Sequence, residues 1–101
     1  MKENLIIREV NGFKINCYES ESLTEEEHQK LIQEWLKSNL INTLNKKHTS
    51  YGIKHACEKA LGFYVSNYDI KYNMARLGVE SRPTESFSIN YFYPISDKAF
   101  S

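Results

Sequence analysis

The sequence predicts a single α+β domain over residues 1–101. Three features predict this class: two β-prone runs separated by Asn-Gly, apolar residues at helical spacing in the middle of the chain, and alternating aromatic residues near its end. A chain of 101 residues can bury one thin core and is too short for two domains. With 26% charged residues, its composition is globular rather than disordered.

The first predicted element is a β-hairpin within residues 1–20. Its strands are residues 5–10 and 13–18, and Asn11-Gly12 joins them. A type I′ turn needs a positive φ at both central residues, and Asn-Gly tolerates this best. Apolar and polar residues alternate in the second strand, so one of its faces is expected to be buried.

A first helical region is predicted over residues 24–44, in which the helical pattern either frays at Ser38-Asn39 or resumes through Leu40, Ile41 and Leu44. Thr24 and Glu27 form the Thr-x-x-Glu pattern of a capping box, which places the helix start at Thr24. The three glutamates after Thr24 lie where the helix dipole favours negative charge, so this acidic run has a structural explanation. The apolar face is expected to hold His28, Leu31, Ile32, Trp35 and Leu36, and the solvent face Glu26, Gln29, Lys30, Gln33 and Lys37.

A second helix is predicted from about Tyr51 to Leu61. Thr49 or Ser50 is expected to cap its start, and Gly62 follows its end as the usual left-handed residue. Its inward stripe is Ile53, Ala56, Cys57, Ala60 and Leu61.

A third helix and two strands complete the predicted elements. Ser66 is expected to cap the helix together with Asp69, and Gly78 ends it. The inward seam of this helix is Ile70, Met74 and Leu77. Residues 79–82 and 87–93 are predicted strands, and Pro94 closes the second of them.

Residues 50–93 therefore have the order helix, short link, helix and β-hairpin. This order, after a first helix, predicts a winged helix-turn-helix preceded by the N-terminal hairpin. Such folds usually present their last helix to nucleic acid.

The distribution of charge agrees with a nucleic-acid partner for the second half of the chain. Residues 1–45 carry five Lys and Arg against eight Glu, a net charge of −3, and residues 46–101 carry eight against five Asp and Glu, a net charge of +3. A basic half raises the expectation of a polyanionic partner. Random scatter of surface charge is the alternative.

The outward face of the third helix is the main candidate site. Once the inward seam is assigned, the opposite stripe holds Tyr68, Lys71, Tyr72, Ala75 and Arg76. Cations contact phosphates and aromatic rings stack on unpaired bases, while the amides of Asn67 and Asn73 suit base edges. The alternative is that the tyrosines pack on the hairpin or the wing. With the basic residues of the connector, the second helix and the wing tip, the expected nucleic-acid-binding residues are Lys46, Lys47, Lys54, Tyr68, Lys71, Tyr72, Arg76 and Arg82.

The sequence carries no pattern of a catalytic or metal site. It has no Gly-rich phosphate loop, no Gly-x-Ser-x-Gly and no His-Glu-x-x-His, and its two cysteines lie far apart, so neither enzyme activity nor a cofactor is expected. No run reaches the ~20 apolar residues of a membrane span, and no signal peptide is recognisable. The protein is therefore expected in the cytoplasm, without a membrane partner.

Three segments carry a resemblance to a known family. Residues 51–55 (YGIKH), 61–67 (LGFYVSN) and 74–78 (MARLG) are similar to small proteins on mobile elements of low-GC Gram-positive bacteria. Within this family the chain most resembles the small single-stranded-DNA-binding proteins of the staphylococcal cassette chromosome replication module. The resemblance covers about residues 48–95. It implies a winged-helix fold and single-stranded DNA binding beside a helicase and a polymerase of the same element.

Three hypotheses follow. The first is a non-catalytic single-stranded DNA-binding protein that supports replication or transfer of a mobile element, which the interleaved tyrosines favour. The second is a duplex-binding transcriptional regulator that places the third helix in the major groove. The third is a small protein-binding inhibitor module whose acidic first half binds the partner.

Overall fold

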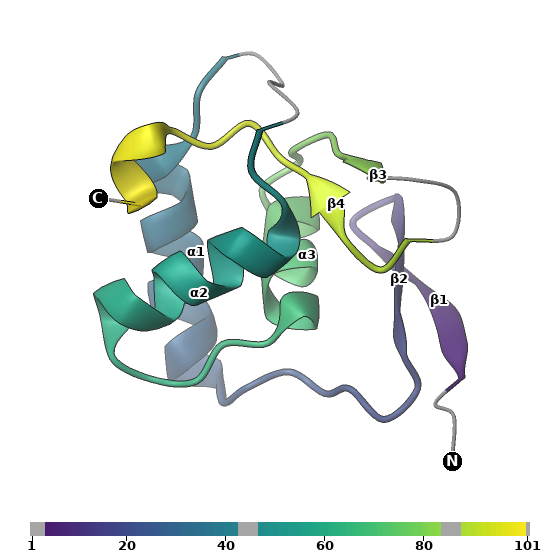
Figure 1. The fold of residues 1–101 in the computed structure, drawn as a ribbon. Helices are drawn as coiled ribbons and strands as arrows, with labels where there is room; N and C mark the ends of the chain where they lie inside the picture. The colour runs from purple at the N-terminus through teal and green to yellow at the C-terminus, as the bar shows by residue number, and fades with distance from the viewer. Residues whose placement is uncertain (1–3, 43–46, 84–87, 101) are drawn as a thin grey trace.

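The computed structural model describes residues 4–42, 47–83 and 88–100, with the backbone alone at residues 82 and 83. It is an α+β fold in which a β-hairpin precedes three helices (Figure 1), as the sequence predicts at this level. The elements are β1 (Leu5–Val10), β2 (Phe13–Tyr18), α1 (Glu26–Asn39), α2 (Ser50–Leu61), α3 (Asn67–Arg76), β3 (Arg82–Pro83), β4 (Tyr91–Phe92) and the 3₁₀ helix η1 (Asp97–Phe100).

The hairpin forms with the predicted strands and turn. Val10 pairs with Phe13, and Asn11 and Gly12 between them have φ values of 52° and 84°. Both values are positive, as a type I′ turn requires. Figure 1 places the hairpin beside α3, on the side of the molecule away from η1.

Helix α1 begins two residues later than the sequence predicts. Thr24 does not cap it, because its amide donates to Asp69 Oδ1 at 3.1 Å and its hydroxyl accepts from Gln29 Nε2 at 2.7 Å. Glu25 is the N-cap and makes no side-chain capping hydrogen bond. The predicted capping box of Thr24 and Glu27 is therefore wrong, because Gln29 of α1 takes the Thr24 hydroxyl and Asp69 of α3 takes its amide.

The predicted caps of α2 and α3 are confirmed. Thr49 Oγ1 accepts from the Gly52 amide at 3.3 Å, and Gly62 after α2 has a φ of 79°. In α3, Ser66 Oγ accepts from the Asp69 amide while Asp69 Oδ2 accepts from the Ser66 amide, both at 2.9 Å. These caps form as predicted because they join residues three apart in the chain.

Two clusters form the core. The larger lies among the three helices and the C-terminal segment and contains Ile32, Leu36, Ile53, Cys57, Val65, Ile70, Met74, Tyr93 and Ile95. Leu77 packs against its edge, so the predicted inward seam of α3 is confirmed. The smaller cluster joins the hairpin to α3 and contains Ile15, Cys17, Tyr68 and Ala75.

The strands that follow α3 are shorter than predicted. Arg82 pairs with Phe92 and Pro83 with Tyr91, two residues in each strand, and residues 84–87 lie outside the described part of the chain. Phe92 also forms a bridge with Thr49, and the Tyr93 amide donates to the His48 carbonyl at 3.2 Å. Strand β4 therefore pairs on its other side with the segment that leads into α2.

Candidate nucleic-acid interface

The hairpin covers most of the α3 face that the sequence predicts as exposed. Tyr68 is 5% exposed and packs with Ile15 and Cys17 of β2. The Arg8 guanidinium of β1 lies 4.9 Å from the centre of its ring. Tyr68 therefore packs on the hairpin, which is the alternative to base stacking that the sequence left open, because the apolar face of the hairpin is buried against this side of α3.

Lys71 is fully buried at the same interface. Its ammonium group donates to the carbonyl and side-chain oxygens of Asn16 and, at 2.9 Å, to the carbonyl of Ile89. Burial lowers the pKa of Lys71 to about 8. Lys71 ties α3 to β2 and to the segment before β4, so it does not lie on an exposed face of α3, as a phosphate contact there would require.

Asn73, expected to contact a base edge, lies between α3 and α1. It is fully buried, its Nδ2 donates to Gln29 Oε1 at 2.7 Å, and its Oδ1 accepts from Gln33 Nε2 at 3.0 Å. The sequence places Gln29 and Gln33 on the solvent face of α1, whereas in the structure both are half-buried at the contact with α3. A buried amide needs polar partners, and the two glutamines supply them.

Two residues of the predicted stripe keep access to solvent. Arg76 is exposed, and Tyr72 is half-buried with its ring edge-on to that of Tyr68 at 6.1 Å. Both line a groove between α1 and α3. Of the five residues that the sequence places on this stripe of α3, these two therefore remain accessible to solvent.

The remaining basic candidates are dispersed. Lys46 lies outside the described residues, as does the side chain of Arg82, whose backbone belongs to β3. Lys47 Nζ forms an ion pair with Asp97 at 2.9 Å. Of these three residues the structure therefore places the side chain of Lys47, which lies at η1 and not at the α3 stripe.

A different surface gathers aromatic side chains around Lys54. We call it the tyrosine groove; it measures about 430 Å³ and is lined by Tyr18, Glu21, Tyr51, Lys54, Tyr64, Ser66, Asn67, Ile89 and Asn90. Tyr51 is 55% exposed and Tyr64 66% exposed, so both rings are available for stacking. Of the eight residues expected from the sequence, Lys54 lies in this groove.

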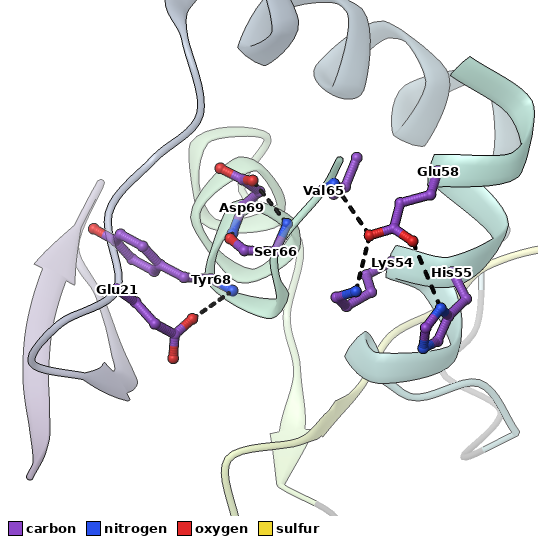
Figure 2. Close-up of polar contacts among 8 residues, drawn as sticks. All are labelled: Glu21, Lys54, His55, Glu58, Val65, Ser66, Tyr68 and Asp69. Atoms are coloured by element: carbon purple, nitrogen blue, oxygen red, sulfur yellow. Dashed lines mark hydrogen bonds and ion pairs between the residues drawn. The ribbon is translucent and has the colours of Figure 1, made fainter. Parts of the chain in front are cut away.

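Lys54 is held at the groove by one carboxylate and one ring, and Figure 2 shows the contact with the carboxylate of Glu58. Its Nζ forms an ion pair with Glu58 at 2.9 Å and lies 5.3 Å from the centre of the Tyr64 ring. Burial alone would raise the pKa of Glu58, but hydrogen bonds from Lys54 and the Val65 amide outweigh it and lower the pKa. Lys54 thus presents a positive charge whose partner stays ionised.

Glu21 is the acidic residue of the groove, and its carboxylate has a structural role. Its Oε1 accepts from the Tyr18 amide at 3.0 Å, and its Oε2 accepts from the Tyr68 amide in the first turn of α3 at 3.3 Å (Figure 2). A carboxylate at a helix N-terminus is stabilised by the helix dipole. With Glu21 and Lys54 both engaged, the groove is aromatic rather than strongly charged.

The sequence held a weak signal for this groove. Tyr51 lies outside the inward stripe of α2, three residues before Lys54, so these two residues share a helix face. Tyr64 lies in the link between α2 and α3, where nothing in the local pattern indicates its direction. No spacing rule joins these residues to Tyr18 or Asn90, because the fold alone brings them together.

Comparisons with protein-family models, with curated proteins and with solved structures find no match to this chain. Among the residues that the structure describes, no group of three or more His, Cys, Asp or Glu is placed to hold a metal ion. None of the described helices is long and apolar enough to cross a membrane.

Proposed function

We propose that the protein is a non-catalytic single-stranded DNA-binding protein and that it binds through the tyrosine groove. The observation that carries this proposal is the pair of exposed rings, Tyr51 and Tyr64, that line one groove together with Lys54. Aromatic side chains stack on unpaired bases at about 1–3 kcal/mol per base, and a neighbouring cation contacts the backbone phosphates. The groove combines two exposed rings with one cation, Lys54, whose charge is shared with Glu58, so stacking is the main contribution that we expect.

The covered face of α3 argues for single strands over duplex. A duplex-binding helix-turn-helix inserts its recognition helix into the major groove and contacts base edges through the outward side chains. In this protein the hairpin occupies that side of α3, with Tyr68 and Lys71 buried beneath it. A stacking groove, by contrast, requires bases that are not already paired.

We further infer that residues 50–93 form a modified winged helix-turn-helix in which the binding surface has moved from the outward face of α3 to its N-terminal end. Ser66 and Asn67 at this end line the groove together with Asn90. The resemblance to small mobile-element proteins supports a role in replication or transfer of such an element. The helicase and polymerase of that mobile element would then act on the same DNA strand as this protein.

Fluorescence anisotropy with a labelled mixed-sequence oligonucleotide tests the proposal. The oligonucleotide should have about 25 nucleotides, longer than the ~4–16-nucleotide sites of single-strand binding domains. We expect the single strand to bind more tightly than the same sequence as a duplex. Tyr51→Ala and Tyr64→Ala should each weaken single-strand binding about tenfold, because each removes one stacking surface.

Two further variants serve as controls. Tyr64→Phe keeps the ring and should bind like the wild type. Tyr72→Ala alters the α3 stripe and should leave affinity unchanged if the groove is the site. Tighter binding to duplex than to the single strand, or a loss of affinity seen with Tyr72→Ala alone, would indicate that the binding site lies on α3. Absence of binding to either form at low salt would contradict the proposal and favour a protein partner.

The salt dependence of binding provides an independent prediction. Each phosphate neutralised on a single strand contributes about −0.7 to the slope of log K against log salt. Of the described cations, Lys54 alone lines the groove, so we expect a slope of about −1 or shallower. A slope several times steeper, measured in the same anisotropy assay, would show that binding depends on a basic surface elsewhere.

A further inference from the structure

Strand β1 leaves one edge of the N-terminal hairpin without a partner strand. The hairpin is a two-stranded antiparallel sheet with an unbroken register, which the Glu19 amide extends by donating to the Asn4 carbonyl at 2.8 Å. Alternate residues of an antiparallel strand bond to the neighbouring strand, so the even-numbered residues of β1, in phase with Asn4, bond to β2. The amides and carbonyls of Leu5, Ile7 and Glu9 therefore point to the free edge. No described residue forms a hydrogen bond with them there.

The other edge of the hairpin is covered by the protein itself. On β2 the Asn16 amide donates to the Tyr91 hydroxyl at 3.3 Å, and the Asn16 carbonyl accepts from Lys71. The Tyr18 amide donates to Glu21 Oε1 at 3.0 Å, and the Tyr18 carbonyl accepts from the Glu21 amide at 2.9 Å. Figure 1 shows β1, in contrast, at the margin of the molecule. The fold therefore satisfies the edge groups of β2 at these residues and leaves those of β1 open.

The side chains along the β1 edge are apolar where edge strands usually carry charge. Leu5 is 46% exposed and Ile7 is 65% exposed, both on the outer face of the strand. Natural sheets prevent edge pairing with Lys, Pro or a β-bulge, and β1 contains none of these. Arg8 is turned toward α3, where its guanidinium lies over a tyrosine ring, so Glu9 is the one charged residue on the outer face of β1. The edge is thus suited to accept another strand.

We propose that β1 pairs antiparallel with β1 of a second copy of this chain, so that two hairpins form one continuous sheet. A row of free amides and carbonyls at alternate residues is satisfied as a set by an added extended strand. In the two-fold register centred on Ile7, this residue exchanges both hydrogen bonds with Ile7 of the second copy. Leu5 exchanges its hydrogen bonds with Glu9 of the second copy, so every edge group of β1 named above gains a partner.

The residues of β1 favour this register and a second copy as the occupant. With Ile7 at the centre, Arg8 lies opposite Ile6 and Glu9 opposite Leu5, so no like charges face each other directly. The two Ile7 side chains meet on the outer face, which buries apolar surface that the monomer exposes. A register centred on Arg8 would place the two arginines opposite each other, and one centred on Ile6 would leave Glu9 opposite no residue of the strand.

Sedimentation velocity of the full chain, from about 10 µM to about 1 mM, tests the pairing. A junction of two short strands is expected to bury less than the ~1,200 Å² of stable interfaces, so the dimer should be weak and depend on concentration. The apparent mass of the wild type should approach twice that of one chain at the highest concentration. The measurement needs no nucleic acid and is independent of the tyrosine groove.

Two variants of Ile7 and one control assign the dimer to this edge. Ile7→Lys places two like charges opposite each other at the centre of the register, and Ile7→Pro removes an edge amide that does not bond to β2. Both should stay monomeric at about 1 mM. Leu31→Lys makes a similar change at an exposed leucine of α1 and should dimerise like the wild type. Circular dichroism verifies that each variant folds.

Single cysteine substitutions test the register. Residues that face each other in a hydrogen-bonded pair have Cα atoms about 5.5 Å apart, within the range of a disulfide. Ile7→Cys should therefore form a covalent dimer in a buffer with oxidised glutathione, where the wild type remains non-covalent because Cys17 and Cys57 are buried. Two copies of Glu9→Cys would hold their cysteines about 13 Å apart along the strands, so this variant should not cross-link.

Three results would overturn the proposal. The first is a wild type that remains monomeric at about 1 mM. The second is a dimer that persists in both Ile7→Lys and Ile7→Pro, which would place the interface on another surface. The third is a cross-link in Glu9→Cys without one in Ile7→Cys, which would exclude the register centred on Ile7. None of these results bears on single-strand binding, which the anisotropy experiments test separately.

Discussion

Asp69→Ala should reduce the free energy of unfolding by about 3 kcal/mol, because it leaves the Ser66 and Thr24 amides without an acceptor, at about 1–3 kcal/mol each. Asp69 is fully buried. Its Oδ1 accepts from the Thr24 amide at 3.1 Å and from Gln29 Nε2 at 2.8 Å, and its Oδ2 accepts from the Ser66 amide at 2.9 Å. One carboxylate thus caps α3 and fixes the chain that enters α1.

Urea denaturation of two matched variants separates these contributions. Ser66→Ala removes the capping hydroxyl alone and should cost about 1 kcal/mol. Asp69→Asn keeps the shape of the side chain but has one acceptor oxygen in place of two, so its loss should lie between those of the other variants. A loss below about 1 kcal/mol for Asp69→Ala would mean that water or a shifted backbone satisfies the two amides.

The same contacts explain which elements could be predicted from the sequence. The Asn11-Gly12 turn and the caps at Thr49 and Ser66 depend on residues within three positions of one another, and all form as predicted. Thr24 fits an equally good local pattern with Glu27, yet Asp69, 45 residues away, binds its amide. A local rule fails where a distant buried group needs the same donor.

The candidate site could not be predicted for a related reason. Helical spacing correctly separates the inward seam of α3 from its opposite stripe, but it does not indicate whether another element covers that stripe. The hairpin covers it, and Tyr68 and Lys71 become core residues. The tyrosine groove combines residues from β2, α2, the link, α3 and the segment before β4, a combination that no sequence period contains.

Lys71 also makes stability depend on pH in the alkaline range. The unfolded chain keeps the Lys71 proton up to a pKa near the ordinary 10.5, whereas the folded protein releases it at about 8 because burial disfavours the charge. Between these values the unfolded state binds more protons, so this group makes unfolding less favourable as pH rises. Below about pH 8 both states are protonated and the full cost of burying the charge is present.

Other buried groups make the free energy of unfolding decrease as pH rises. Burial raises the pKa of the Cys17 and Cys57 thiols, to about 12 for Cys57, and also raises that of the Tyr93 hydroxyl. The unfolded chain loses these protons first, so each group lowers stability as pH rises past its ordinary pKa. The pH profile of the wild type alone therefore cannot isolate Lys71.

The contribution of Lys71 to the pH dependence of stability is isolated by comparing the wild type with Lys71→Met. We expect the free energy of unfolding of the wild type, relative to that of the variant, to increase by about 3 kcal/mol between pH 7 and 10.5, the equivalent of the lowered pKa. Urea denaturation across this range, with reductant present, measures the difference, and Lys30→Met at an exposed site of α1 controls for loss of a lysine charge. A difference between wild type and Lys71→Met that stays constant with pH would place the ammonium group in contact with solvent. The hairpin would then not seal the face of α3, and this stripe would again be available to a nucleic acid.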